Sequence, residues 1–227
     1  MRVAVVQHRM RAHERMDLAS LLTLCERASE EGAQVIVLPA VPGLAGNELL
    51  IQAFLRNAEE RAPGLTWITP QHVWGGVGEP VCRPTALGST LVLGQDHCID
   101  PDVIAGAQEL SCDTMVWQFD AEDALQAEAL LEFALDASVA VTPLIVIADV
   151  VGSARGVEGH GTSAIVYMGE IMAEAGSGED LLIADVPAPA PLTQPSRRVP
   201  SPAPVLAQRL AAHHGTKLAT PYPADLT

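Results

Sequence analysis

Hydrophobic residues fall into two patterns along this chain, short unbroken runs and longer stretches with helical spacing. The runs predict buried strands at 3–6, 35–38, 89–93, 114–119, 144–148 and 181–186. The helical spacing predicts helices at 17–31, 47–57, 100–110 and 121–138. Met168-Gly169 lies between two extended stretches, 162–167 and 170–174, and is typical of a tight hairpin. This order predicts an α/β fold with two mixed sheets and helices outside them.

Glycine and proline mark the predicted connections. Gly32 is expected to end the first long helix, whose N-cap is Asp17. The segment Ala62–Pro84 is rich in both residues and predicts a loop with short extended pieces. The segment Gly152–Gly161 predicts a glycine-rich loop.

The composition changes sharply after Val186, because residues 187–204 hold seven of the 17 prolines. A segment this rich in proline does not fit the interior of a sheet. We therefore predict one domain over residues 1–186 and a proline-rich C-terminal tail or arm over 187–227. The arm either reaches a neighbouring subunit or lies unstructured on the surface.

Composition and charge exclude several classes of function. The formal net charge of −15 disfavours binding to nucleic acid or to anionic membranes. The chain starts with a strand-like run and not a signal-peptide pattern, and its longest apolar stretch, Val139–Val151, is too short to span a bilayer. We therefore expect a cytoplasmic protein.

The four cysteines, Cys25, Cys82, Cys98 and Cys112, show no Cys-x-x-Cys pair and no zinc-finger spacing. In a chain of this length they are expected to be unpaired core thiols. No cofactor or metal is predicted.

The run GAQVIVLPA, residues 32–40, reads as a helix end, a buried strand and a stop at Leu38-Pro39. In α/β folds, the carboxyl ends of strands are where functional residues usually lie. The residue at this end is Ala40, whose methyl group can neither donate nor accept a proton.

Three stretches, in order, resemble the nitrilase-like (carbon–nitrogen hydrolase) superfamily. The first is 1–40. The second is Thr-Ala-Leu-Gly at 85–88 with TLVLGQD at 90–96 and Pro-Asp at 101–102, and the third is the hairpin and last strand at 161–186. Roughly 160 residues follow the pattern. The resemblance implies a four-layer α-β-β-α sandwich that forms a homodimer through its outer helices. In this chain we expect the C-terminal arm to take part in the dimer contact.

The resemblance also implies a reaction that uses a cysteine nucleophile, a glutamate base and a lysine that stabilises the tetrahedral intermediate. In this sequence, the glutamate position reads as Ala40 and the cysteine position as Gly94. The single lysine, Lys217, lies in the predicted tail, so the lysine has no counterpart. Ala40 and Gly94 are also only 54 positions apart, which indicates shortened loops between them.

The sequence offers few substitutes for the absent groups. Cys98 is the obvious thiol and His97 a candidate base, although both fit ordinary loop or core roles better. The other candidates for a vestigial pocket are the neighbours of Gly94, Gln95 and Asp96, and the loop residue His160. Asp96 fits better as a brace of the turn after the strand.

The sequence therefore predicts a catalytically inactive nitrilase-like protein with a binding or structural role. The alternative is a carbon–nitrogen hydrolase that acts on small amides through a rearranged site. A third possibility is a small-molecule-binding module that uses the vestigial cavity; the ligand is unknown.

Overall fold

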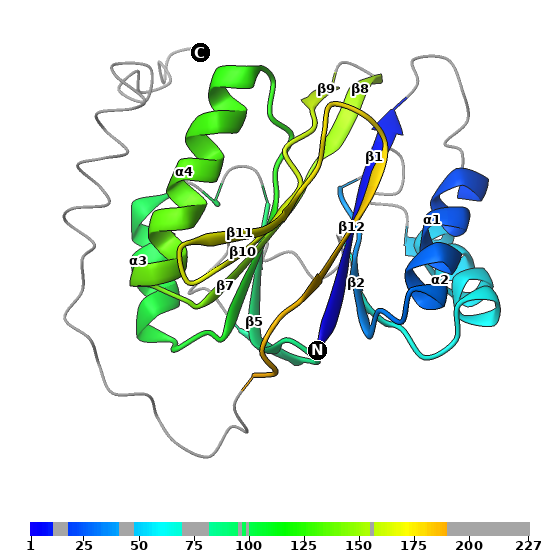
Figure 1. The fold of residues 1–227 in the computed structure, drawn as a ribbon, viewed down its shortest axis with the longest axis horizontal. Helices are drawn as coiled ribbons and strands as arrows, with labels where there is room; N and C mark the ends of the chain where they lie inside the picture. Colours follow the sequence, from blue (N-terminus) through cyan, green and yellow to red (C-terminus); the bar gives the residue numbers. More distant parts are fainter. Residues whose placement is uncertain are drawn as a thin grey trace, which may run out of the picture.

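Two six-stranded sheets lie between two pairs of helices in the computed structural model (Figure 1). The structure describes residues 1–10, 18–40, 48–69, 82–94, 97–98, 100–154 and 157–189. The helices are α1 (Leu18–Glu30), α2 (Glu48–Arg61), α3 (Pro101–Glu109) and α4 (Ala124–Ala140). The strands are β1 (Arg2–Met10), β2 (Val35–Val37), β3 (Thr66–Ile68), β4 (Arg83–Thr85), β5 (Gly88–Leu93), β6 (Thr114–Gln118), β7 (Leu144–Ala148), β8 (Val150–Ala154), β9 (Val157–His160), β10 (Ala164–Tyr167), β11 (Glu170–Glu174) and β12 (Asp180–Asp185).

Each sheet is mixed. The first has the order β3-β2-β1-β8-β9, and β12 pairs antiparallel with β1. The second has the order β11-β10-β7-β6-β5-β4, with β5, β6 and β7 parallel. The parallel strands are apolar on both faces, as expected where both faces of a sheet are covered.

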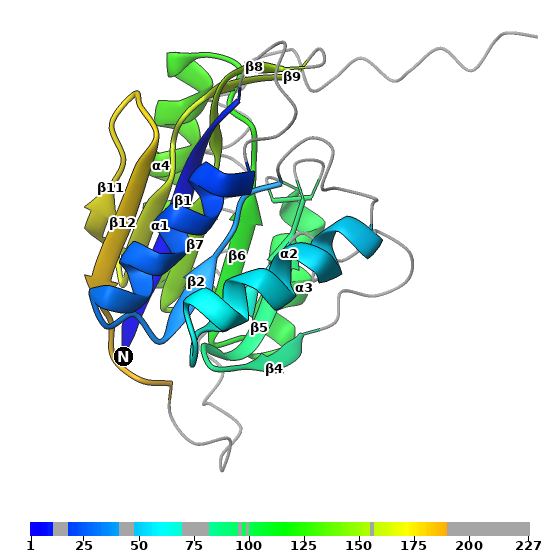
Figure 2. The same ribbon diagram turned by 90° about the vertical axis from the view of Figure 1, so that its right-hand side faces the viewer.

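Three separate hydrophobic clusters show that the molecule has four layers. One cluster lies between the first sheet and helices α1 and α2, and includes Leu21 and Phe54. A second lies between the two sheets and includes Val5 and Val146. The third lies between the second sheet and helices α3 and α4, and includes Trp117 stacked on Phe133. Figure 2 looks onto helices α1 and α2, with the strands of the sheets behind them. The predicted four-layer α-β-β-α sandwich is therefore confirmed.

Most predicted elements are present, and the prediction of a loop over Gly152–Gly161 is wrong. This segment forms β8 and β9, an antiparallel pair whose first strand extends the first sheet beside β1. Its glycines permit close packing of backbones here. At Gly152, which has a φ of +92°, a Cβ atom would lie 2.7 Å from the carbonyl oxygen of Met10. Glycine content alone could not distinguish this close approach from a loop.

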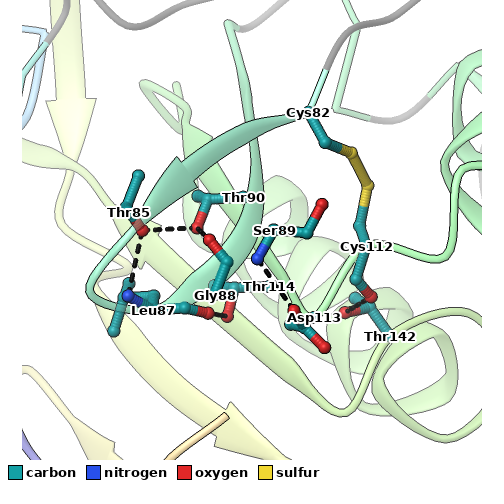
Figure 3. Close-up of a disulfide and its surroundings, with 10 residues drawn as sticks. All are labelled: Cys82, Thr85, Leu87, Gly88, Ser89, Thr90, Cys112, Asp113, Thr114 and Thr142. Carbon is teal, nitrogen blue, oxygen red and sulfur yellow. Dashed lines mark hydrogen bonds between the residues drawn. A yellow bond between two sulfur atoms is a disulfide. The ribbon is translucent and has the colours of Figure 1, made fainter. Parts of the chain in front are cut away.

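The expectation of core thiols is confirmed for Cys25 and Cys98, which are buried, and is wrong for the other two cysteines. Cys82 and Cys112 form a disulfide, with their Cα atoms 6.5 Å apart (Figure 3). The β4–β5 hairpin places Cys82 beside the turn that precedes β6, where the Ser89 N–H also donates to Asp113. The two cysteines are 30 residues apart in the sequence, so only the tertiary fold brings them together.

The predicted domain boundary remains a prediction. Val186 donates its N–H to the carbonyl oxygen of Met1 at the end of the last strand, and the tail from residue 190 lies outside the described residues. None of the described helices has the length and apolar character needed to cross a membrane.

Candidate functional site

The carboxyl ends of the parallel strands in both sheets meet at one edge of the sandwich. The direct link is the side chain of Gln118, at the end of β6, which donates from Nε2 to the carbonyl oxygen of Leu38 at 2.9 Å. Leu38 follows β2, so this bond joins the carboxyl ends of a strand from each sheet. Functional residues of α/β folds are usually found at such an edge.

The two positions that the resemblance singled out both lie after strands that end at this edge. Ala40 lies three residues after β2 and is partly buried. Gly94 directly follows β5 and is also partly buried. Neither residue has a side-chain group that can attack, donate or accept a proton. Gln95 and Asp96 lie outside the described residues.

The chain turns immediately after Gly94 and carries Cys98 away from the edge. The Gly94 carbonyl oxygen accepts from the N–H groups of His97 (3.0 Å) and Cys98 (3.1 Å), which closes a tight turn. Cys98 is fully buried in the cluster between the second sheet and helices α3 and α4, together with Leu91 and Leu93. His97 is partly buried in the turn. The turn therefore shortens the distance from Gly94, but it places the thiol in a helix-facing core.

All four cysteines of the sequence are described, and none is an exposed thiol. Cys82 and Cys112 are joined in the disulfide. Cys25 lies in the core beneath α1, where burial raises its pKa to about 12 and keeps the thiol protonated at neutral pH. Cys98 has an exposed fraction of 0%. The single lysine, Lys217, lies outside the described residues.

Asp149 lies where the chain crosses from one sheet to the other. It is the single residue between β7 of the second sheet and β8 of the first, and it is completely buried. Its carboxylate accepts the N–H groups of Val150 at 2.6 Å, Thr162 at 2.9 Å and Ala121 at 3.4 Å. Burial raises the pKa of Asp149 to about 7, because the three hydrogen bonds lower this pKa by less than burial raises it.

The chain returns to the second sheet through Thr162 and Ser163, and this return segment is bonded to Asp149. The Ser163 hydroxyl accepts from the Asp149 N–H at 3.0 Å and contacts its carbonyl oxygen at 3.3 Å. The Ser163 N–H donates to the side chain of Gln7 in β1. Ser163 therefore holds the two crossings together, and its hydroxyl is occupied by main-chain partners. This arrangement indicates a structural role for Ser163.

Asp120 is a second carboxyl group at the same edge, two residues beyond β6. Burial raises its pKa to about 6, and its charge in turn raises the pKa of Asp149. Its Oδ1 atom is buried without a hydrogen-bond partner. His160 lies nearby at the end of β9, where its N–H donates to the carbonyl oxygen of Ala121 and its side chain is exposed.

The sequence prediction named Ala40, Gly94, Cys98 and His160 but missed Gln118, Asp120 and Asp149 as members of this edge. The sequence contains a signal for both aspartates, which is their place after a buried apolar run. Asp149 directly follows β7, and Asp120 is separated from β6 by one residue. In the described residues, no group of three or more His, Cys, Asp and Glu side chains is arranged to hold a metal ion.

Comparison with known proteins gives a fold relationship. No family model matches the chain, and no curated protein matches it. Among solved structures, an amidase variant from Nesterenkonia sp. AN1, with acrylamide added to its active-site cysteine, matches with a TM-score of 0.65 and 19% identity over 82% of this chain and 93% of that one. The fold is that of a nitrilase-superfamily amidase. A cysteine-to-alanine variant of the same amidase, described as a nitrilase-superfamily member, matches with a TM-score of 0.64 and 19% identity over 94% of this chain and 95% of that one.

Proposed function

We propose that this protein uses the nitrilase-type sandwich for binding and does not carry out the thiol-dependent hydrolysis of carbon–nitrogen bonds. The observation that carries the proposal is the state of its cysteines. A thiolate is the attacking species in cysteine catalysis, and it requires access and a lowered pKa. Here two cysteines share a disulfide, one has a raised pKa in a core, and Cys98 is sealed behind the second sheet.

The edge of the sandwich supports the same proposal. In a glutamate-to-glutamine variant of the Nesterenkonia amidase, acrylamide and the acetamide moiety of fluoroacetamide are added to the active-site cysteine. By the resemblance in the sequence, the corresponding position here is Gly94, and the base position is Ala40. The glutamate and the cysteine replaced in the amidase variants are much further apart along that chain than the 54 positions between Ala40 and Gly94. A shorter connection leaves less chain to build the walls of an active site.

Turnover measurements test this proposal. The purified protein is incubated with a panel of small aliphatic and aromatic amides and nitriles, and ammonia release is followed over hours. We expect no release above the rate of a heat-denatured sample. The matched variants are Cys98→Ala and Cys25→Ala, which both remove a buried thiol.

Ammonia release by the native protein that disappears in Cys98→Ala and persists in Cys25→Ala would overturn the proposal. Release that persists in both variants would not depend on either thiol; it would contradict the binding role and favour a hydrolase with a rearranged site. A folded protein without release supports the binding role.

The proposal includes the predicted homodimer through the outer helices and the C-terminal arm. On one outer layer, α4 exposes Leu125 and Val139, with exposed fractions of 75% and 70%. Both side chains lie on a layer of outer helices, through which the resemblance implies the contact with a second copy. Light scattering after size-exclusion chromatography tests this: a mass of one chain at micromolar concentration would contradict the dimer.

A further inference from the structure

Two oxygen atoms at the carboxyl edge of β6 are buried without a hydrogen-bond partner, Gln118 Oε1 and Asp120 Oδ1. Gln118 has an exposed fraction of only 2%, and its Nε2 is already committed to the carbonyl oxygen of Leu38. Because only the amide nitrogen can donate to a carbonyl, the oxygen of this amide must point elsewhere. A buried acceptor without a partner is costly in a folded protein.

The two acceptors belong to one place in the fold. Gln118 ends β6, and the alternation of the strand continues to Phe119, because Met115, Trp117 and Phe119 all lie in the helix-facing cluster. Asp120 is therefore expected on the same side of the chain as Gln118, since alternate residues point to the same face. That face is turned toward the first sheet, because Gln118 contacts Leu38 and Val116, two residues earlier, lies in the cluster between the sheets. Asp149 is close enough to Asp120 for the charge of one to affect the other.

Positive charges and hydrogen-bond donors are too few around Gln118, Asp120 and Asp149 to pair with all of their oxygen atoms. The groups that donate to Asp149 are all main-chain N–H groups. Neither carboxyl forms an ion pair with any described residue. Two neighbouring buried carboxyl groups are stabilised by an added cation far more than by a neutral group.

We propose that Gln118, Asp120 and Asp149 form a binding site for a small organic cation with N–H donors, an alkylammonium or amidinium group. This rests on the proposed binding function and names its ligand class. Asp120 contacts the cation directly, Gln118 accepts one of its N–H groups, and Asp149 adds charge while it holds the sheet crossing. The net charge of −15 further favours cationic ligands.

Isothermal titration calorimetry with acetamidinium and ethylammonium tests the proposal, because acetamide is a neutral compound of nearly the same shape as acetamidinium. We expect the cations to bind at least tenfold more tightly than acetamide. Asp120→Asn and Gln118→Leu should each weaken cation binding tenfold or more, whereas Glu128→Gln, on the exposed side of α4, should leave it unchanged. Equal binding of acetamidinium and acetamide, or unchanged cation binding by Asp120→Asn, would overturn the site.

A second measurement on the unaltered protein keeps the proposal testable if a variant fails to fold. A cation bound beside Asp120 favours the ionised carboxyl, so binding near pH 6 must release a proton, which is detected by titration in two buffers of different ionisation enthalpy. Among the described residues, the titratable groups placed near Asp120 include Asp149, the neighbouring Glu122 and His160, whose main chain bonds to Ala121. Binding without proton release would overturn the site. Ammonia release from amides is measured in a separate experiment. A protein that neither binds these cations nor releases ammonia would refute the cation site but not the proposed absence of hydrolysis.

Discussion

The buried carboxyl group of Asp149 should make the protein less stable as the pH rises. Its pKa is about 7 in the folded state and 3.8 in an ordinary exposed position. The folded protein therefore retains a proton that the unfolded chain releases between these values. A raised carboxyl pKa of this kind lowers the free energy of unfolding as the pH increases from about 4 to about 7, after which the loss levels off.

The size of this effect follows from the shift. Each pKa unit corresponds to about 1.4 kcal/mol, so between pH 5 and pH 8 Asp149 should lower the free energy of unfolding by roughly 2–3 kcal/mol. Asp149→Asn removes the titration. The substitution also replaces one acceptor oxygen by an amide group facing a main-chain N–H, which costs about 1–2 kcal/mol at every pH. The informative quantity is therefore the pH dependence and not the absolute stability.

Urea unfolding of both proteins at several pH values measures this dependence. We expect the difference in free energy of unfolding between Asp149→Asn and the unaltered protein to shift by roughly 2–3 kcal/mol in favour of the variant from pH 5 to pH 8. Glu128→Gln removes an exposed carboxyl and serves as the control, with no comparable shift. A difference for Asp149→Asn that stays constant with pH would contradict a raised pKa, because it would show that this carboxyl titrates normally in the folded state.

Three further predictions concern the frame around the site. In thermal or urea unfolding, Gly152→Ala should destabilise the protein by about 1–3 kcal/mol more than Gly64→Ala. Both glycines have positive φ, but only at Gly152 would a Cβ meet a main-chain oxygen, at 2.7 Å. Equal losses of stability in the two variants would contradict the close approach of β8 to β1. Reduction with dithiothreitol should lower the free energy of unfolding by about 3–4 kcal/mol, because the disulfide closes a loop of 30 residues. The double variant Cys82→Ser, Cys112→Ser should show no response to the reductant. A response that survives in the double variant would contradict the pairing. Asp123→Ala should lower the free energy of unfolding by about 1 kcal/mol, because the Asp123 side chain accepts a main-chain N–H of the first turn of α4 at 2.8 Å. Asp123→Asn should retain most of the stability. Equal losses of stability in the two variants would contradict a capping role.

The layers of the fold were predictable because the apolar pattern is local. Runs such as Leu144–Ala148 are buried on both faces, and the β2 run ends as expected near Leu38. The β8–β9 pair was not predictable in the same way. Its strands are short and each contains a glycine. Strand β8 is fixed by pairing with the distant end of β1, and β9 by pairing with β8. Long-range pairing of this kind overrides local propensity.

The candidate site was only partly predictable for a similar reason. The sequence identified Ala40 and Gly94 as residues without chemical groups at strand ends, and the structure describes both after the expected strands. It could not show that the turn after Gly94 directs Cys98 into the helix-facing core, because the direction of a side chain after a turn depends on tertiary packing. It also could not show that Asp120 and Asp149 interact, since 29 positions separate them and only the pairing of β6 with β7 brings the strand ends together.

The proposed function requires that no thiol of the folded protein is available as a nucleophile. Native protein incubated with acrylamide or fluoroacetamide and analysed by intact mass spectrometry tests it most directly, with a urea-denatured sample as the positive control. We expect no adduct on the native protein and two adducts on the denatured, non-reduced protein, at Cys25 and Cys98. One adduct that forms rapidly on the native protein, and that is absent in Cys98→Ala, would contradict it.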